Sequence, residues 1–146
     1  MITENINQKI AEALKEKNDT KLTTYRMLAS ALNYEFIAKQ HELSDEEEWA
    51  VVNREIKKRK EAMEAYRKVK AEDRAEQEEQ EMKVLYEFLP AQLAEKEIKK
   101  MVIDAIKKTN AKGVGDMGKV IGMVMSQAKG KADGGKVSEM VRQILK

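Results

Sequence analysis

The chain has 146 residues, a formal net charge of +2, one histidine and no cysteine. This composition excludes disulfide bonds, thiolate metal sites, cysteine nucleophiles and sites that need two histidines. No run of about 18 apolar residues suggests a membrane span. The N-terminus also lacks the basic start and apolar core of a signal peptide. We therefore expect a cytoplasmic protein with no membrane partner.

The amino-acid usage favours helices along the whole chain. One proline, seven glycines and few aromatic residues provide few turn or strand signals. Ala, Glu, Lys, Met, Gln and Leu, which are strong helix formers, fill the sequence. We predict an all-α protein, in which an N-terminal helical hairpin or bundle is followed by a small three-helix unit.

Two N-terminal helices are predicted to pair as a hairpin. Apolar residues recur at helical spacing over residues 2–14 and again over residues 20–40, with Asn18 and Asp19 between them. Helices that are joined by so short a break lie antiparallel.

A third helix is predicted to begin with a capping box. The Ser44 side chain can accept a hydrogen bond from the backbone N–H of Glu47, whose carboxylate can accept one from the Ser44 N–H. Apolar residues then form a near-heptad seam, which Arg59 interrupts. The members of this seam are Trp49, Val52, Ile56, Met63 and Tyr66.

The segment 70–81 is almost entirely charged or polar and has almost nothing to bury. We interpret it as a solvated helix, or as a turn between two helices that protrude beyond the core. Apolar residues return in 82–89, and Pro90 is predicted to end this helix because the residue before a proline is pushed out of the α region. The charge balance changes at the same proline, so we predict domains at 1–90 and 91–146.

The last part of the sequence is basic. Residues 91–146 hold 12 of the 28 Lys and Arg residues but 6 of the 26 Asp and Glu residues, which is a net charge of +6. Residues 1–90 carry the remainder, a net of −4. Such segregation suggests that the C-terminal part meets an anion. The alternative is that the lysines only make a small helical domain soluble.

Three short amphipathic helices are predicted beyond the proline. Gly113 and Gly115 are expected to end the first helix, and Asp116 is expected to cap the second. Gly130 is expected to follow the second helix, and Asp133 to cap the third. Each helix is too short to be stable alone in water, so the three apolar stripes must share one core.

Gly118 and Gly122 lie four residues apart on one face of the second of these helices. The favoured interpretation is close helix packing, since two glycines let another backbone approach. The alternative is that the bare backbone lets a sugar–phosphate strand come near.

The sequence offers no catalytic constellation. His41 stands among polar residues, as is typical of a solvated loop, and the glutamates lie in charge runs from which no acid–base pair emerges. The segment 130–136 matches the first seven positions of a phosphate-binding P-loop. However, Val137 stands where Ser or Thr must ligate magnesium, and Asp133 adds negative charge. The sequence therefore favours a protein that is not an enzyme and that uses no cofactor or metal.

Five motifs stand out along the chain: Leu28–Asn33, Arg54–Arg59, Leu89–Leu93, Gly115–Gly122 and Lys129–Gly134. In combination they resemble the GatB/YqeY family, and the resemblance to its stand-alone YqeY-like members covers essentially the full length. It implies an N-terminal helical domain and a C-terminal three-helix domain. The latter is similar to the tail of the B subunit of the glutamyl/aspartyl-tRNA amidotransferase, which holds the body of the tRNA.

The resemblance also implies a set of RNA-binding residues. The chain differs from the tail signature at Gly134, where a proline often follows the capping residue, so the cap is expected to be looser. Catalysis does not carry over, because the ATP- and glutamate-handling domain of the B subunit has no counterpart in this chain. The positions that match the tail signature are Lys119, Lys129, Gly130, Lys131 and Ala132. With Lys136 added for its charge, the expected binding residues are Lys119, Lys129, Gly130, Lys131 and Lys136, and the structural ones are Pro90, Gly118, Gly122, Ala132 and Asp133.

Three functions are left open. The favoured one is a non-catalytic accessory protein that binds tRNA or another folded RNA, with lysines that neutralise phosphates and recognition of shape rather than of bases. The second is an adaptor that binds a protein through the helical hairpin in residues 45–90. The third is an auxiliary factor for glutamine-dependent tRNA transamidation, since a carbon–nitrogen ligase label belongs to the family by association.

Overall fold

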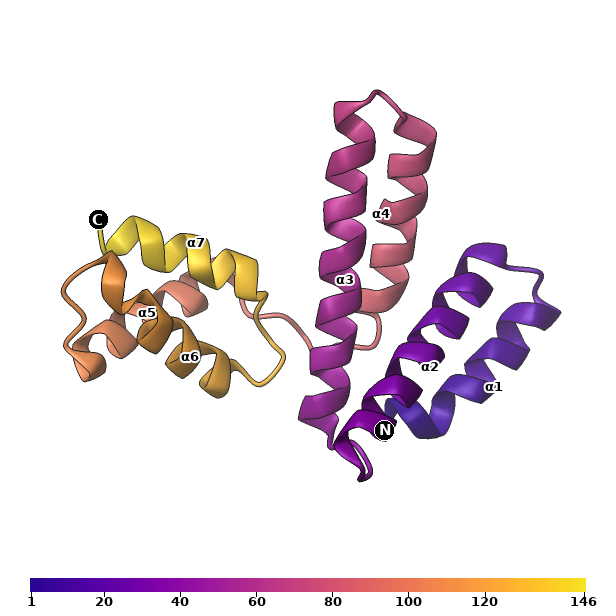
Figure 1. Cartoon of the computed structure of the whole chain (residues 1–146), viewed down its shortest axis with the longest axis horizontal. Coiled ribbons are helices and arrows are strands. Elements are labelled where there is room, and N and C mark those ends of the chain that lie inside the picture. The colour runs from indigo at the N-terminus through magenta and orange to yellow at the C-terminus, as the bar shows by residue number, and fades with distance from the viewer. The chain divides into compact units, whose positions relative to one another are not determined.

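The computed structural model describes all 146 residues and contains seven α-helices, one short 3₁₀ turn and no β-strand (Figure 1). The all-α prediction is confirmed. The helices form two compact units, residues 1–89 and 90–146, and each unit has its own hydrophobic core. None of the helices has both the length and the apolar character needed to cross a bilayer.

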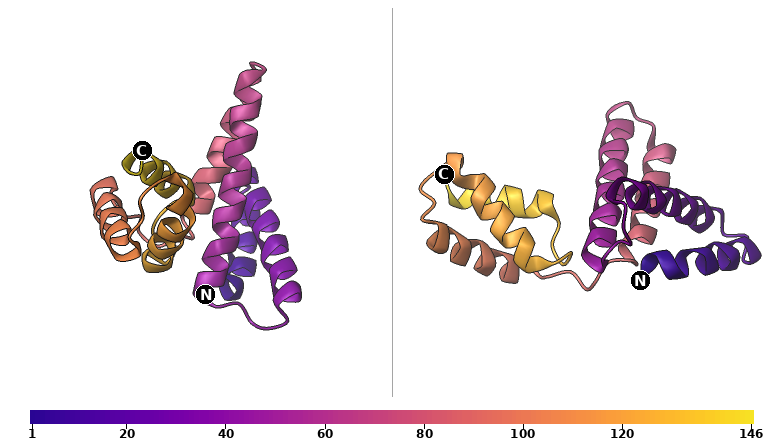
Figure 2. Two further views of the ribbon diagram at one scale, coloured as in Figure 1. Left: turned by 60° about the vertical axis from the view of Figure 1, so that its left-hand side comes forward. Right: turned by 60° about the horizontal axis from the view of Figure 1, so that its bottom comes forward.

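The N-terminal unit consists of two helical hairpins. Helices α1 (Ile2–Lys15) and α2 (Asp19–Lys39) form the first, and α3 (Asp45–Lys68) and α4 (Glu72–Tyr86) form the second. Both views of Figure 2 show the two members of each hairpin side by side. Helix α2 packs against both helices of the second hairpin, so it occupies the middle of this unit.

The core of the N-terminal unit lies where the two hairpins meet. Leu28 of α2, Val52 of α3 and Leu85 of α4 are completely buried within one apolar cluster. Burial of each such side chain contributes about 1.5–3 kcal/mol. Tyr25 and Phe88 add an edge-on ring contact with centroids 5.6 Å apart. Helix α1 adds Ile6 and Ala13 to the same cluster, so all four helices of this unit share one core.

The starts of α2 and α3 follow local capping chemistry. The Asn18 side chain accepts a hydrogen bond from the Lys21 N–H at 3.1 Å. The predicted capping box is confirmed, because Ser44 and Glu47 exchange two hydrogen bonds of 3.2 Å. The hydrogen bond from the Ser44 backbone is also the main reason that the pKa of Glu47 is lowered.

The polar segment 70–81 is less solvated than its composition suggests. The turn between the helices is confined to residues 69–71, and the rest of the segment belongs to α4. Ala75 and Glu81 are buried in this helix. The segment is therefore mostly an exposed turn and helix, as expected, but two of its residues are buried because one face of α4 packs against α3.

The end of α4 does not coincide with the proline. The helix ends at Tyr86, four residues before Pro90. Residues 87–89 continue in tighter turns, in which each N–H bonds to the carbonyl three residues earlier. The expectation that Pro90 ends the helix was therefore wrong in its position.

The C-terminal unit is a bundle of three helices, α5 (Glu95–Thr109), α6 (Met117–Ala128) and α7 (Gly134–Ile144). A 3₁₀ turn at Val114–Asp116 leads into α6, and each helix contacts the other two. The three apolar stripes share one core, as the sequence predicts. Its buried members are Ile98, Val102, Ala105, Val120, Val124, Ala128, Ala132, Val137, Val141 and Leu145.

Helix α5 ends earlier than its glycines suggest. The last helical residue is Thr109, and Asn110 follows in the left-handed region with a φ of 55°. Asparagine adopts this conformation more readily than most residues. The expectation that Gly113 and Gly115 end the helix was therefore wrong.

The two predicted aspartate caps of this unit differ in outcome. Asp116 does precede α6, but its carboxylate accepts a hydrogen bond from the Lys112 N–H at 3.0 Å and bonds no helical N–H. Asp133 caps α7 as predicted, through a 3.1 Å hydrogen bond from the Gly135 N–H. The cap forms with Gly134 in the position where the family often has a proline.

Candidate nucleic-acid interface

The loop that joins α6 to α7 begins with two residues of left-handed backbone. Lys129 ends α6 with a φ of 46°, and Gly130 follows with a φ of 79°. Gly130 was expected to follow the end of α6, and it does so, directly after the C-cap residue Lys129. A glycine suits this position, because a residue of positive φ costs a side chain steric strain.

The backbone of this loop is fixed by the segment that precedes α5. The Leu93 N–H donates to the Lys131 carbonyl at 2.8 Å, and the Gln92 side-chain amide donates to the Gly130 carbonyl at 3.1 Å. Ala132 is buried in the core of the unit. The loop is therefore held by two hydrogen bonds and by an apolar anchor.

Four candidate lysines are exposed: Lys119, Lys129, Lys131 and Lys136. None of them has a carboxylate oxygen within the 4.0 Å that defines an ion pair. Half of the acidic residues in 91–146 accept hydrogen bonds from backbone N–H groups instead. These are Glu97, Asp116 and Asp133.

The positions of the four lysines are not equivalent. Lys129 and Lys131 belong to the loop between α6 and α7, and Lys136 lies in the first turn of α7. Lys119 lies in the first turn of α6. Ten residues of helix separate Lys119 from Lys129, which is about 15 Å along the axis. The fold therefore places three of the lysines at one end of α6 and the fourth at the other.

Gly118 and Gly122 are not explained by packing within this chain. Both are exposed, and a Cβ atom at either position would meet nothing within 4 Å. The close-packing interpretation was therefore wrong for contacts inside the protein. Alanine would favour the helix by about 1 kcal/mol over glycine at each site. The glycines leave an open stretch of bare helix backbone on α6.

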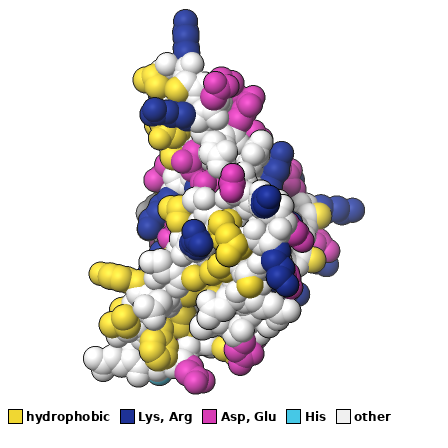
Figure 3. Space-filling model, turned by 90° about the vertical axis from the view of Figure 1, so that its right-hand side faces the viewer, with side chains coloured by type: hydrophobic (Ala, Val, Ile, Leu, Met, Phe, Trp, Pro, Cys, Tyr) yellow, Lys and Arg dark blue, Asp and Glu magenta, His cyan; other side chains and the backbone are white.

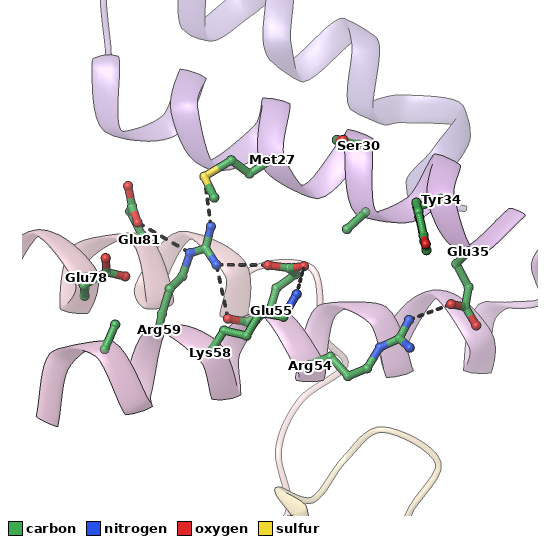
Figure 4. Close-up of a pocket in the computed structure, with 12 residues that line it drawn as sticks. Met27, Ser30, Tyr34, Glu35, Arg54, Glu55, Lys58, Arg59, Glu78 and Glu81 are labelled. Atoms are coloured by element: carbon green, nitrogen blue, oxygen red, sulfur yellow. Dashed lines mark hydrogen bonds and ion pairs between the residues drawn. The ribbon is translucent and has the colours of Figure 1, made fainter. Parts of the chain in front are cut away.

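Arg59, which appears in the sequence as a break in the apolar seam, lies at the centre of a buried polar cluster (Figure 4). It donates to Glu55 Oε2 at 3.0 Å and to the sulfur of Met27 at 3.2 Å. Its Nε lies 3.5 Å from Glu81 Oε2 in an ion pair. Arg59 therefore links α3 to both α2 and α4. In the sequence, only the four-residue spacing of Glu55 and Arg59 indicates that these two side chains can pair on one face of a helix.

Glu48 has a structural role that the sequence did not reveal. Its side chain is fully buried, and its carboxylate accepts hydrogen bonds from the Ile2 N–H at 3.2 Å and from both the N–H and the hydroxyl of Thr3 at 2.6 Å. Met1 provides no side-chain cap for α1. A residue of α3 therefore caps the start of α1, across 45 positions of sequence.

An open pocket of about 940 Å³ lies between α2 and the hairpin of α3 and α4. The chain has no group of three or more His, Cys, Asp or Glu side chains that could hold a metal ion. The pocket is lined by Met27, Ser30, Ala31, Tyr34, Glu35, Arg54, Glu55, Lys58, Arg59, Ala62, Glu78 and Glu81.

The ionisation of Glu78 in this pocket should make the stability of the protein depend on pH. Burial raises the pKa of Glu78, the charge of Glu81 raises it further, and Arg59 opposes both. The folded state thus disfavours the ionised form, so stability is lost as the pH rises through the raised pKa. We expect Glu78→Gln to increase the free energy of unfolding at pH 7. The increase should vanish well below pH 4.5, the ordinary pKa of the group, as urea denaturation at both pH values can show.

The fold and these sites define a class of all-α proteins in which a unit of two helical hairpins is joined to a basic three-helix unit. The model of the family described as Yqey-like protein matches residues 3–145. A similar protein is an uncharacterized protein of Schizosaccharomyces pombe, which is 31% identical over 85 residues, or 58% of this chain and 69% of the relative. The chain therefore belongs to the YqeY-like family.

Proposed function

We propose that this protein is a non-catalytic accessory factor that binds folded RNA, and tRNA in the first instance, through its C-terminal unit. The observation that carries the proposal is the loop between α6 and α7. Lys129, Lys131 and Lys136 are exposed around this loop and have no carboxylate partner. Unpaired ammonium groups are available to neutralise phosphates and release their counterions.

The fixed backbone of the loop supports the proposal. Because Gln92 and Leu93 hold the loop by hydrogen bonds, little ordering of the chain is needed when a ligand binds. The net charge of +6 in residues 91–146 attracts a polyanion over a longer range.

Recognition in this unit is expected to depend on the shape of the RNA backbone. Residues 91–146 contain no Phe, Tyr or Trp, so stacking of bases on aromatic side chains cannot occur there. The open helix face at Gly118 and Gly122 would let a sugar–phosphate strand come close to α6. The resemblance of the segments 115–122 and 129–134 to the tail of the amidotransferase B subunit favours tRNA as the ligand.

The experiment is a titration of the full chain with fluorescently labelled tRNA, read by anisotropy at several salt concentrations. We expect the Lys129→Ala/Lys131→Ala variant to bind about tenfold more weakly at moderate salt. The slope of log affinity against log salt should fall by about 2 in magnitude, because two phosphate contacts are lost.

The matched control is the Lys107→Ala/Lys108→Ala variant. It removes the same charge from the last turn of α5, about 20 Å along that helix from its start near the loop. It should bind nearly as well as the wild type. Equal affinities and slopes for the wild type and the loop variant would refute the assigned interface. Equal affinity for duplex DNA and tRNA would refute recognition of folded RNA.

A further inference from the structure

Helix α2 has apolar residues on two faces, and one of these faces is uncovered. Tyr25, Leu28 and Leu32 are buried in the core. Met27, Ala31 and Tyr34, spaced by four and three residues, instead line the pocket between the hairpins. Met27 is 47% exposed and Tyr34 is 77% exposed. A helix that is apolar on both faces is normally covered on both.

The uncovered face is long enough to contact a helix. The exposed Ile37 extends it by nearly one turn, so that the stripe of residues 27–37 spans about 15 Å. The opposite wall comes from Lys58 and Ala62 of α3 and from Glu78 of α4. Figure 4 shows Met27 and Tyr34 extending from α2 towards the hairpin of α3 and α4. On the face seen in Figure 3, hydrophobic side chains are exposed in a group.

The charges of the pocket favour a basic occupant. Glu78 has no cation within 4.0 Å, and it lies on the same helix as Glu81, three residues away. The pocket thus has a carboxylate that forms no ion pair within this protein, although the charge of Arg59 acts on it from a distance. Each cation of the pocket already has a carboxylate partner: Arg54 has Glu35, Lys58 has Glu55, and Arg59 has Glu55 and Glu81.

We propose that the pocket binds one amphipathic helix of a partner protein. Apolar residues of that helix cover Met27, Ala31 and Tyr34, and a lysine or arginine beside them pairs with Glu78. This is binding of a helix in a groove, in which apolar anchors at helical spacing supply affinity and a charge pair selects the register. The proposal concerns the N-terminal unit and does not depend on RNA binding by the C-terminal unit.

Other occupants fit the pocket less well. A nucleic acid would bring phosphates towards Glu78, which has no ion-pair partner. A second copy of this chain has no other helix with an exposed apolar stripe. The exposed large apolar residues of α1, α4, α5 and α7 stand singly, at Leu14, Tyr86, Ile103 and Ile144. Only α2 itself could fill the pocket of another copy.

The test uses a displayed library of 18-residue helical peptides, with apolar residues at positions i, i+3, i+4 and i+7 and randomised polar positions, selected on the full chain. We expect enriched peptides that share a lysine or arginine at one position. They should bind Tyr34→Asp at least tenfold more weakly than the wild type. The control Asn33→Asp, which adds the same charge to the neighbouring exposed position, should bind like the wild type.

A charge exchange tests the pairing with Glu78. The Glu78→Lys variant should bind an enriched peptide at least tenfold more weakly than the wild type does. A peptide whose basic residue is changed to glutamate should regain affinity for this variant. The proposal is overturned if no enriched peptide distinguishes Tyr34→Asp from the wild type, or if the exchange restores nothing. It is also overturned if sedimentation shows that the chain alone forms a dimer that Tyr34→Asp dissociates.

Discussion

Replacement of Arg59 with leucine should lower the free energy of unfolding by about 3–5 kcal/mol, because loss of one partner leaves the carboxylates of a buried ion cluster uncompensated. The carboxylates concerned are those of Glu55 and Glu81, whose side chains are each 10% exposed. Urea denaturation at pH 7, followed by the circular dichroism of the helices, measures this effect.

Two companion variants separate the buried charge from general disruption. Lys58→Ala removes the other cation that contacts Glu55, but Lys58 is 70% exposed, so the loss should be below about 1 kcal/mol. Replacement of all three buried groups, as Arg59→Met with Glu55→Leu and Glu81→Leu, should restore much of the stability. A loss below about 1 kcal/mol for Arg59→Leu alone would contradict the assignment of a buried cluster.

Glu48→Ala should lower the free energy of unfolding by about 2–4 kcal/mol, since hydrogen bonds to charged groups contribute more than neutral ones and buried donors left unpaired are costly. The carboxylate of Glu48 is the acceptor for the first N–H groups of α1, at Ile2 and Thr3. Amide exchange in the first turn of α1 should accelerate together with the loss of stability.

Glu46→Ala is the matched control for this variant. Glu46 is an exposed acidic residue in the same first turn of α3, so its removal should change the free energy of unfolding by no more than about 0.5 kcal/mol. If both variants lost the same stability, the effect would come from the dipole of α3. The hydrogen bonds from α1 to Glu48 of α3 would then contribute nothing to the free energy of unfolding.

The two units differ in whether their charged side chains form ion pairs. In the N-terminal unit, cations pair with carboxylates both on the surface, as Arg54 does with Glu35, and in the interior, as Arg59 does. In the C-terminal unit no ion pair forms, and the exposed lysines face solvent. This difference is consistent with the two proposed ligands, a polyanion for the C-terminal unit and a basic helix for the N-terminal unit.

Local features were the ones that could be predicted from the sequence. The all-α fold and the shared core of α5, α6 and α7 followed from helical periodicity, which depends on near neighbours. Two helix caps were also predicted correctly, the capping box of Ser44 and Glu47 and the cap at Asp133. The bonded atoms of each cap lie within three residues of each other. The predicted ends of α4 and α5 were wrong, since several residues in each stretch can stop a helix.

The tertiary structure alone decided what the polar residues do. Nothing in the sequence near Glu48 indicates that it caps α1, because its partners lie 45 residues away. Arg59 became a core residue only because α2 and α4 supply Met27 and Glu81 around it. The exposure of Gly118 and Gly122 likewise depends on which face of α6 the other helices cover. Periodicity determines which residues form helices, whereas burial and pairing depend on segments that meet only when the chain folds.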